Sequence, residues 1–132
     1  MLNPFSDLLA LGFLAPTILR VAVGCLFLYA GYYHWTHRST IGNISFPLIG
    51  RGEWIASASA LAHVAVGAMF VFGYYVQIAA LLGALSALKG LIMVKKFEIV
   101  FPYSRSTYVL IIAISFSLLL SGAGLFAFDV YL

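Results

Sequence analysis

Charged residues are scarce in this sequence. Only 8% of its 132 residues are Asp, Glu, Lys or Arg, whereas 64% are hydrophobic and the mean hydropathy is +1.08. A water-soluble domain carries about 25% charged residues, so this composition cannot surround a core with a solvated surface. Most apolar side chains must therefore face lipid. The sequence predicts an integral membrane protein whose first partner is the lipid bilayer.

Cysteine, basic clusters and catalytic motifs are also scarce. Cys25 is the single cysteine, which excludes an intrachain disulfide and a CxxC redox pair. The seven Lys and Arg residues are scattered rather than gathered in a stripe, so nucleic-acid binding is not expected. The sequence has no phosphate-binding loop, no pair of catalytic carboxylates and no zinc signature. We therefore expect no metal site and no intrinsic cofactor, and the sequence leaves enzyme activity undecided.

Apolar stretches long enough to cross a bilayer, which takes about 20 helical residues, dominate the chain. The predicted spans are residues 16–34, 54–72, 76–94 and 107–126. A very short turn joins the second and third spans, which must therefore lie antiparallel. Residues 1–15 are apolar but short and predict an interfacial helix against the bundle. The expected fold class is all-α: one transmembrane domain over residues 1–132, an up-down four-helix bundle with that short N-terminal helix.

Small residues recur at helical spacing along each predicted span. Such stripes let neighbouring helices approach closely in a membrane. They are Gly24 and Gly31 in the first span, Ala56, Ala60, His63 and Gly67 in the second, Ala80, Ala84, Ala87 and Gly90 or Leu91 in the third, and Ala113, Ser117, Ser121 and Gly124 in the fourth. These faces could serve packing within the chain or a homo-oligomer equally well.

The basic residues of the connections predict an orientation. The first and third connections carry Arg38, Arg51, Lys95, Lys96 and Arg105. Only Arg20 lies near the opposite ends of the spans. By the positive-inside rule, both termini are expected on the non-cytoplasmic side of the cell membrane.

Four ionisable residues lie in or beside the spans: Arg20, Glu53, Lys89 and Asp129. A charge at the centre of a span costs about 3 kcal/mol or more, so each needs a partner, water or an interface. Depth along the antiparallel helices predicts that Arg20 pairs with Asp129, and Glu53 with Lys89. These pairs could simply fix the helix register, or Arg20 could mark a site for an oxyanion or a quinone carbonyl. Arg20 and Lys89 could also snorkel to the headgroups.

His63 is expected to point into the bundle. There it could relay protons, ligate a haem or hydrogen-bond a serine across the bundle. A bis-histidine haem needs a second inward histidine at similar depth, but His34 and His37 are expected at the end of the first span. We therefore do not expect haem. His34 and His37 share a helical face without a carboxylate or cysteine to complete a metal site, and we interpret both as interfacial polar residues.

Three segments resemble the DoxX family of membrane proteins. They are RVAVGCLFLYAG after Pro16, GRGEW at the start of the second span, and SGAGLFAFD, which ends at Asp129. The family often has a basic residue where Leu125 stands. The resemblance implies a four-helix membrane protein tied to redox chemistry, since some members resemble the quinone-reducing subunit of a thiosulfate oxidoreductase. It also implies that Arg20, Glu53 and Asp129 are the positions at stake, whereas Lys89 follows from depth alone.

Two functions follow from these observations. The resemblance implies a redox-associated subunit that positions a non-covalently bound quinone or a small sulfur oxyanion, with Arg20 and Asp129 at one mouth of the bundle. No side chain in the sequence stores electrons, so this function requires a membrane or membrane-attached redox partner protein, or the quinone itself. The alternative is a non-catalytic membrane scaffold or small transporter-like bundle, in which the charges organise packing.

Overall fold

The fold is described from a computed structural model that covers residues 6–45 and 50–122. Within these ranges the chain is helical and contains no β-strand, which confirms the all-α prediction. The helices are α1 (Ser6–Leu9), the 3₁₀ turn η1 (Gly12–Leu14), α2 (Ala15–Thr36), α3 (Arg38–Gly42), α4 (Glu53–Phe72), α5 (Val76–Met93) and α6 (Arg105–Ser121).

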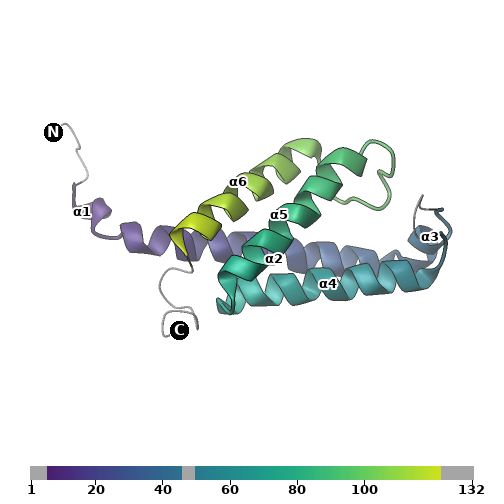
Figure 1. The fold of residues 1–132 in the computed structure, drawn as a ribbon, viewed down its shortest axis with the longest axis horizontal. Helices are drawn as coiled ribbons and strands as arrows, with labels where there is room; N and C mark the ends of the chain where they lie inside the picture. Colours follow the sequence, from purple (N-terminus) through teal and green to yellow (C-terminus); the bar gives the residue numbers. More distant parts are fainter. Residues whose placement is uncertain (1–5, 46–49, 123–132) are drawn as a thin grey trace.

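The long helices form two antiparallel pairs (Figure 1). One pair is α2 with α4, and the other is α5 with α6, which crosses the first pair at an angle. Helix α2 begins and α6 ends at the same end of the bundle, while α3 lies at the opposite end. By length and composition, the segments Gly12–Thr36, Glu53–Phe72 and Val76–Met93 can each cross a membrane, and the apolar helix α6 is shorter, with 17 residues.

Local sequence explains where these helices begin and end. Pro16 occupies the first turn of α2, where a missing N–H costs nothing. The hydroxyl of Ser104 accepts a hydrogen bond from the N–H of Thr107 and so caps α6. Helix α4 ends at Gly73, whose φ of 71° is the left-handed conformation that suits glycine. The short turn that follows reverses the chain direction, and α5 then crosses α4 at an angle.

Glycines bring the backbones of α2 and α4 into direct contact. A Cβ atom at Gly67 would lie 2.9 Å from the carbonyl oxygen of Gly24 and 2.9 Å from the amide nitrogen of Leu28. A Cβ atom at Gly31 would lie 3.0 Å from the carbonyl oxygen of Ala60. Distances this short leave no space for a side chain. The small-residue stripes expected on these two helices therefore form an interface within the chain.

The stripe expected on α6 was wrong for its three described residues, and its fourth member, Gly124, lies outside the described residues. Ala113, Ser117 and Ser121 are exposed, and the buried face of this helix carries Tyr108, Ile111, Ser115 and Leu118. The reason lies in α5, which supplies the small residues at this interface. A Cβ atom at Gly90 would lie 2.6 Å from the ring of Tyr108. Helix α6 therefore contributes the large side chains that fill the space over α5.

The N-terminal segment differs from the single helix that was expected against the bundle. In its described part, residues 6–14, it forms only the four-residue α1 and the three-residue η1, which extend beyond the start of α2 (Figure 1). Its described side chains, among them Asp7, Leu8 and Leu11, are mostly exposed. A segment this short buries too little surface against its neighbours to hold a longer helix.

Replacing Gly67 with Ala tests the contact between α2 and α4. The added methyl group must push two backbones apart, so we expect the free energy of unfolding to fall by about 1–3 kcal/mol. Gly12→Ala is the matched control, since no atom lies within 4 Å of the Cβ position there. Thermal unfolding in detergent measures both. Equal stability of the two variants would contradict the close contact.

Candidate functional site

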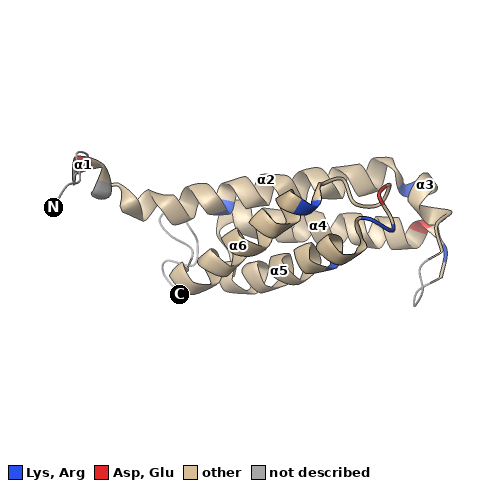
Figure 2. Ribbon diagram, turned by 90° about the horizontal axis from the view of Figure 1, so that it is seen from above, with Lys and Arg blue, Asp and Glu red and all other residues tan. Residues whose placement is uncertain are grey.

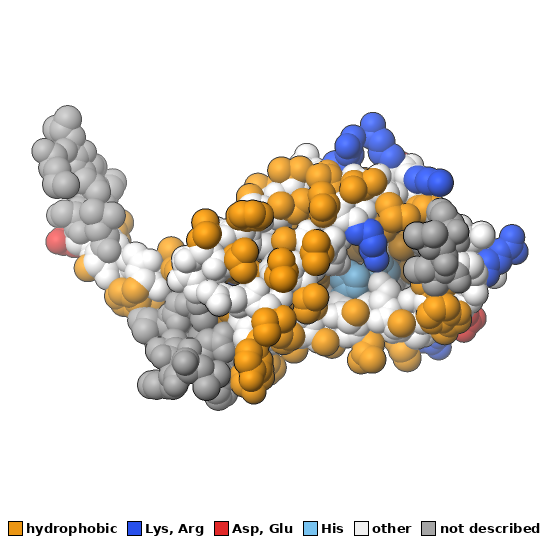
Figure 3. Space-filling view, viewed as in Figure 1, with side chains coloured by type: hydrophobic (Ala, Val, Ile, Leu, Met, Phe, Trp, Pro, Cys, Tyr) orange, Lys and Arg blue, Asp and Glu red, His pale blue; other side chains and the backbone are white. Residues whose placement is uncertain are grey.

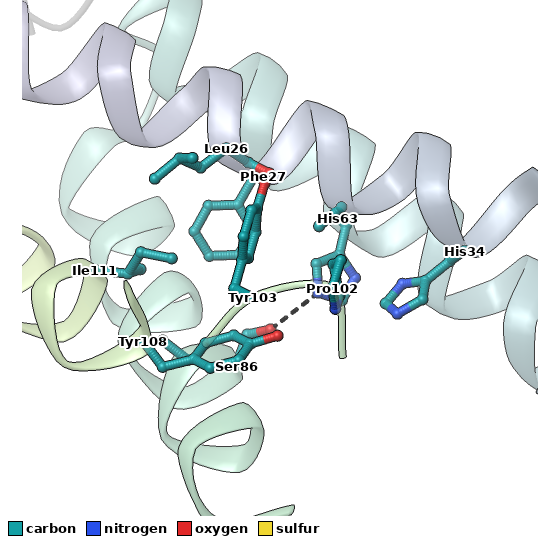
Figure 4. Close-up of a pocket in the computed structure, with 11 residues that line it drawn as sticks. Leu26, Phe27, His34, His63, Ser86, Pro102, Tyr103, Tyr108 and Ile111 are labelled. Carbon is teal, nitrogen blue, oxygen red and sulfur yellow. Dashed lines mark hydrogen bonds between the residues drawn. The ribbon is translucent and has the colours of Figure 1, made fainter. Parts of the chain in front are cut away.

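Two histidines from different helices meet where α2 and α4 touch. The ring centroids of His34 on α2 and His63 on α4 are 4.8 Å apart, and the rings meet edge to face at 73°. His34 is only 2% exposed, and His63 is partly buried and stacks on Phe27. Figure 4 shows both rings at one end of an internal cavity. Rings in direct contact leave no room for a haem plane between them.

Hydrogen bonds to backbone carbonyls define the tautomer of each neutral ring. Nδ1 of His63 lies 2.7 Å from the carbonyl oxygen of Ser59, and Nε2 of His34 lies 2.7 Å from that of Val100. A carbonyl oxygen only accepts, so these two nitrogens carry the protons. The other nitrogens are acceptors: Nδ1 of His34 lies 3.2 Å from the hydroxyl of Ser59, and Nε2 of His63 lies 3.3 Å from that of Ser86. Both serines therefore donate.

The connection between α5 and α6 folds back over α2 and closes the cavity. The hydroxyl of Tyr33 donates to the carbonyl oxygen of Ile99 at 2.7 Å, and the hydroxyl of Tyr103 donates to that of Leu26 at 2.6 Å. Together with the contact between His34 and Val100, these contacts hold the connection against the second half of α2. Burial raises the pKa of Tyr103, and the neighbouring Tyr108 and Tyr29 add to this effect. Tyr103 therefore stays a neutral donor.

The cavity enclosed by these contacts is small. Its volume is about 20 Å³, room for a single water molecule. Its polar lining comes from five segments: helices α2, α4, α5 and α6 supply His34, His63, Ser86 and Tyr108, and the connection between α5 and α6 supplies Tyr103 (Figure 4). Aliphatic and aromatic side chains complete the wall. The cavity is thus too small for an organic ligand, but several hydroxyl and imidazole groups surround its water-sized space.

A larger groove lies on the other side of His63, between the diverging helices α4 and α5. Its volume is about 850 Å³ and its lining is mostly apolar. The polar side chains in it are Ser59, His63, Ser86 and Lys89. His63 and Ser86 line both spaces, so they form the wall between the cavity and the groove. Figure 3 shows histidine reaching the surface beside a basic side chain, with hydrophobic side chains around them.

The expected pair of Glu53 and Lys89 is not brought together. Both side chains are exposed, and no ion pair joins these two described residues. Glu53 begins α4 and packs against α3, where a Cβ at Gly42 would lie 2.9 Å from its Cγ. Lys89 lies instead at the groove, within electrostatic range of both histidines. Depth alone predicted the wrong neighbour because α5 crosses α4 at an angle rather than running alongside it.

The expected pair of Arg20 and Asp129 stays a prediction. Arg20 lies on α2 and is only 1% exposed, so it does not snorkel to the headgroups. Asp129 lies outside the described residues. A guanidinium buried this deeply requires compensation by hydrogen bonds or an opposite charge.

The interpretation of His34 as an interfacial residue was wrong. It was grouped with His37 at the end of a span, but the connection between α5 and α6 covers it and leaves only His37 exposed. Ser59 was also missed as a bridge between the histidines. Its spacing of four residues from His63 on α4 was the available signal, because residues at i and i+4 share a helical face.

The apolar helices, their close-packed glycines and the buried polar groups define a small helical membrane protein. The sequence model of the DoxX family matches residues 15–96, which include both histidines, Ser59, Ser86 and Lys89. The chain therefore belongs to the DoxX family. The match ends before α6 and before the segment SGAGLFAFD, which contains Asp129. Searches among curated proteins and among solved structures found no match.

Replacing Ser59 with Ala tests the bridge between the histidines. The change removes the donor to Nδ1 of His34, so we expect the free energy of unfolding to fall by about 1 kcal/mol, as for other hydrogen bonds between membrane helices. Ser57→Ala, two residues earlier on α4, is the matched control. Thermal unfolding in detergent compares them. If both variants match the native protein, the Ser59 bridge contributes nothing to stability.

Replacing Tyr103 with Phe tests the closure of the cavity. Below pH 10.0, the ordinary tyrosine pKa, we expect the free energy of unfolding to fall by about 1 kcal/mol, because the hydrogen bond to the carbonyl of Leu26 is removed. The raised pKa means that the folded protein holds the phenol proton more tightly than the unfolded chain. Native stability is therefore fully present below that pH and decreases above it. Above pH 10.0, the stability of Tyr103→Phe should decrease less steeply than that of the native protein. The stability of Tyr32→Phe, an exposed control, should follow the native protein.

Proposed function

We propose that this DoxX-family protein is a redox-associated membrane subunit that positions a quinone in the groove between α4 and α5. The observation that carries the proposal is the combination of an apolar groove of about 850 Å³ with polar groups grouped at His63, Ser86 and Lys89. Small-molecule sites have this character: mostly hydrophobic walls, a volume of roughly 300–1,000 Å³ and a few polar groups that fix orientation.

The chemistry of a quinone suits these walls. Its ring and alkyl tail are apolar and can lie along the alanine-rich face of α4 and the leucines of α5, which are exposed and would face lipid. Leu82 and Leu85 are 44% and 58% exposed. The ammonium of Lys89 can donate a hydrogen bond to a carbonyl oxygen. A ligand that partitions into the bilayer could enter this groove sideways without crossing the headgroups.

A small sulfur oxyanion is the less favoured ligand. A hydrated anion gains little from apolar walls, and losing its hydration requires dense polar contacts. Arg20, the cation expected to serve such an anion, is buried on α2 and does not line the groove. The electrons for quinone chemistry would come from a membrane-attached partner protein.

The proposed arrangement in the membrane has four spans with both termini on the non-cytoplasmic side. Basic residues gather towards the α3 end and in the connection between α5 and α6, whereas α2 carries one basic position farther along the bundle (Figure 2). This asymmetry supports the α3 end as the cytoplasmic end. Labelling of single cysteines introduced at Arg38 or Asp7, after replacement of the exposed Cys25 by Ala, would test the orientation.

Quenching of Trp54 fluorescence by a short-chain alkyl quinone tests the proposal. Trp54 lines the groove, and the only other tryptophan, Trp35, can be replaced by Phe. We expect saturable quenching of the full chain in detergent. Ala62→Phe should weaken binding about tenfold or more, because its ring fills the groove.

Leu61→Phe is the matched control, since this neighbouring side chain points away from the groove and is 73% exposed. It should bind as the native protein does. Absence of saturable quenching, or equal binding by both variants, would contradict a quinone site in this groove. A non-catalytic scaffold would then be the better interpretation.

A further inference from the structure

We propose that the groove between α4 and α5 binds an anionic phospholipid, with its phosphate on Lys89 and one acyl chain along the groove, and that this lipid competes with the quinone. The lipid site depends only on the walls of the groove. Its competition with the quinone rests on the proposed function, because both ligands would need the same space.

Lys89 is the only charged side chain among the described residues that line the groove. The other polar groups there already bond to one another. The hydroxyl of Ser86 donates to Nε2 of His63, and Nδ1 of His63 donates to the carbonyl oxygen of Ser59. The Lys89 ammonium has three N–H donors, and no hydrogen bond or ion pair within the described ranges engages them. The groove therefore offers a ligand one cation with no acid beside it, which suits an anionic head group.

The polar end of the groove lies at the depth of the lipid head groups. Helix α4 begins and α5 ends towards the same end of the bundle (Figure 1). Lys89 lies four residues before the end of α5 at Met93, about 6 Å from that end. A lysine at this depth lays its alkyl stem on apolar surface and reaches the head groups with its ammonium. Trp54, in the first turn of α4, also lines the groove and is 60% exposed, and tryptophan favours the membrane interface.

The rest of the groove has the walls and the length that an acyl chain needs. Ala62, Ala65 and Met69 lie on the α4 side, and Leu82 lies on the α5 side. From Trp54 to Met69 helix α4 rises about 22 Å, which exceeds the ~15 Å of hydrocarbon in one leaflet. The surrounding lipid is as apolar as these walls. We therefore expect the phosphate, rather than the chain, to decide which lipid binds.

Quenching of Trp54 by brominated phospholipids tests the lipid site. The full chain with Trp35→Phe is reconstituted in phosphatidylcholine vesicles that contain a rising fraction of phosphatidylglycerol. Bromine is placed near the glycerol end of one acyl chain, in either lipid in turn. Bromine quenches tryptophan only at close range, so the two curves give the relative affinity of the lipids beside Trp54. We expect a preference of about fivefold for phosphatidylglycerol, the effect of one lysine near the membrane surface.

Variants of Lys89 separate this site from the general surface charge. Lys89→Met should remove the preference, and Lys89→Arg should keep it because the charge is retained. Lys89 is exposed, so thermal unfolding of both variants should match the native protein. Lys96→Met is the matched control, since Lys96 is exposed but does not line the groove, and it should keep the preference. With Trp54→Phe and Trp35 as the reporter, Lys89→Met should change nothing, because Trp35 lies outside the groove.

Competition is measured separately, with lipids that carry no bromine. Replacing phosphatidylcholine by phosphatidylglycerol in mixed micelles should lower the apparent affinity of the native chain for the short-chain quinone by about fivefold, because the tighter lipid occupies the groove. The quenching of Trp54 by the quinone reports this affinity.

Equal binding of the two lipids beside Trp54, or a preference that survives Lys89→Met, would overturn the lipid site. An unchanged affinity for the quinone in phosphatidylglycerol would overturn the competition. A preference for phosphatidylglycerol without any saturable quenching by the quinone would support the lipid site and contradict only the proposed function.

Discussion

The site depends on the backbone contact between α2 and α4. Gly24, Gly31 and Gly67 allow these helices to touch without intervening side chains, and only at that distance do His34 and His63 meet with Ser59 between them. Membrane helices lack a hydrophobic driving force for association, so close packing and interhelical hydrogen bonds must hold them. The glycines supply the first and the histidine chain supplies the second. Structural stability and the candidate chemistry therefore share one interface.

The second pair of helices turns this interface into a site. Helix α5 crosses α4 at an angle, which opens the groove and brings Ser86 and Lys89 to the groove side of His63. The connection between α5 and α6 closes the opposite side through Tyr103 and Val100. One side of the histidine pair thus lines the groove between α4 and α5, and the other side lies against the α5–α6 connection. Unpaired polar groups are costly in a membrane, and here both ring nitrogens of each histidine have hydrogen-bond partners.

Periodicity and composition predicted the parts of the fold that depend on local sequence. The helical segments, the small faces of α2, α4 and α5, and the inward direction of His63 are read from spacing along one helix. His34 was misplaced because a connection remote in sequence covers it, and no pattern within α2 reveals that. Lys89 was paired wrongly because its depth is known from sequence but the crossing angle of α5 is not. Both failures concern how elements meet, which is decided by packing between segments distant in the chain.

The tautomers of the two buried histidines test the central claim most directly. Nuclear magnetic resonance of ¹⁵N-histidine-labelled protein in bilayers distinguishes a protonated from an unprotonated ring nitrogen. The account predicts opposite neutral tautomers, with the proton on Nε2 of His34 and on Nδ1 of His63, because each of these nitrogens donates to a backbone carbonyl. Identical tautomers, or rings that exchange freely between both forms, would show that no ordered chain of hydrogen bonds joins the groove to His34.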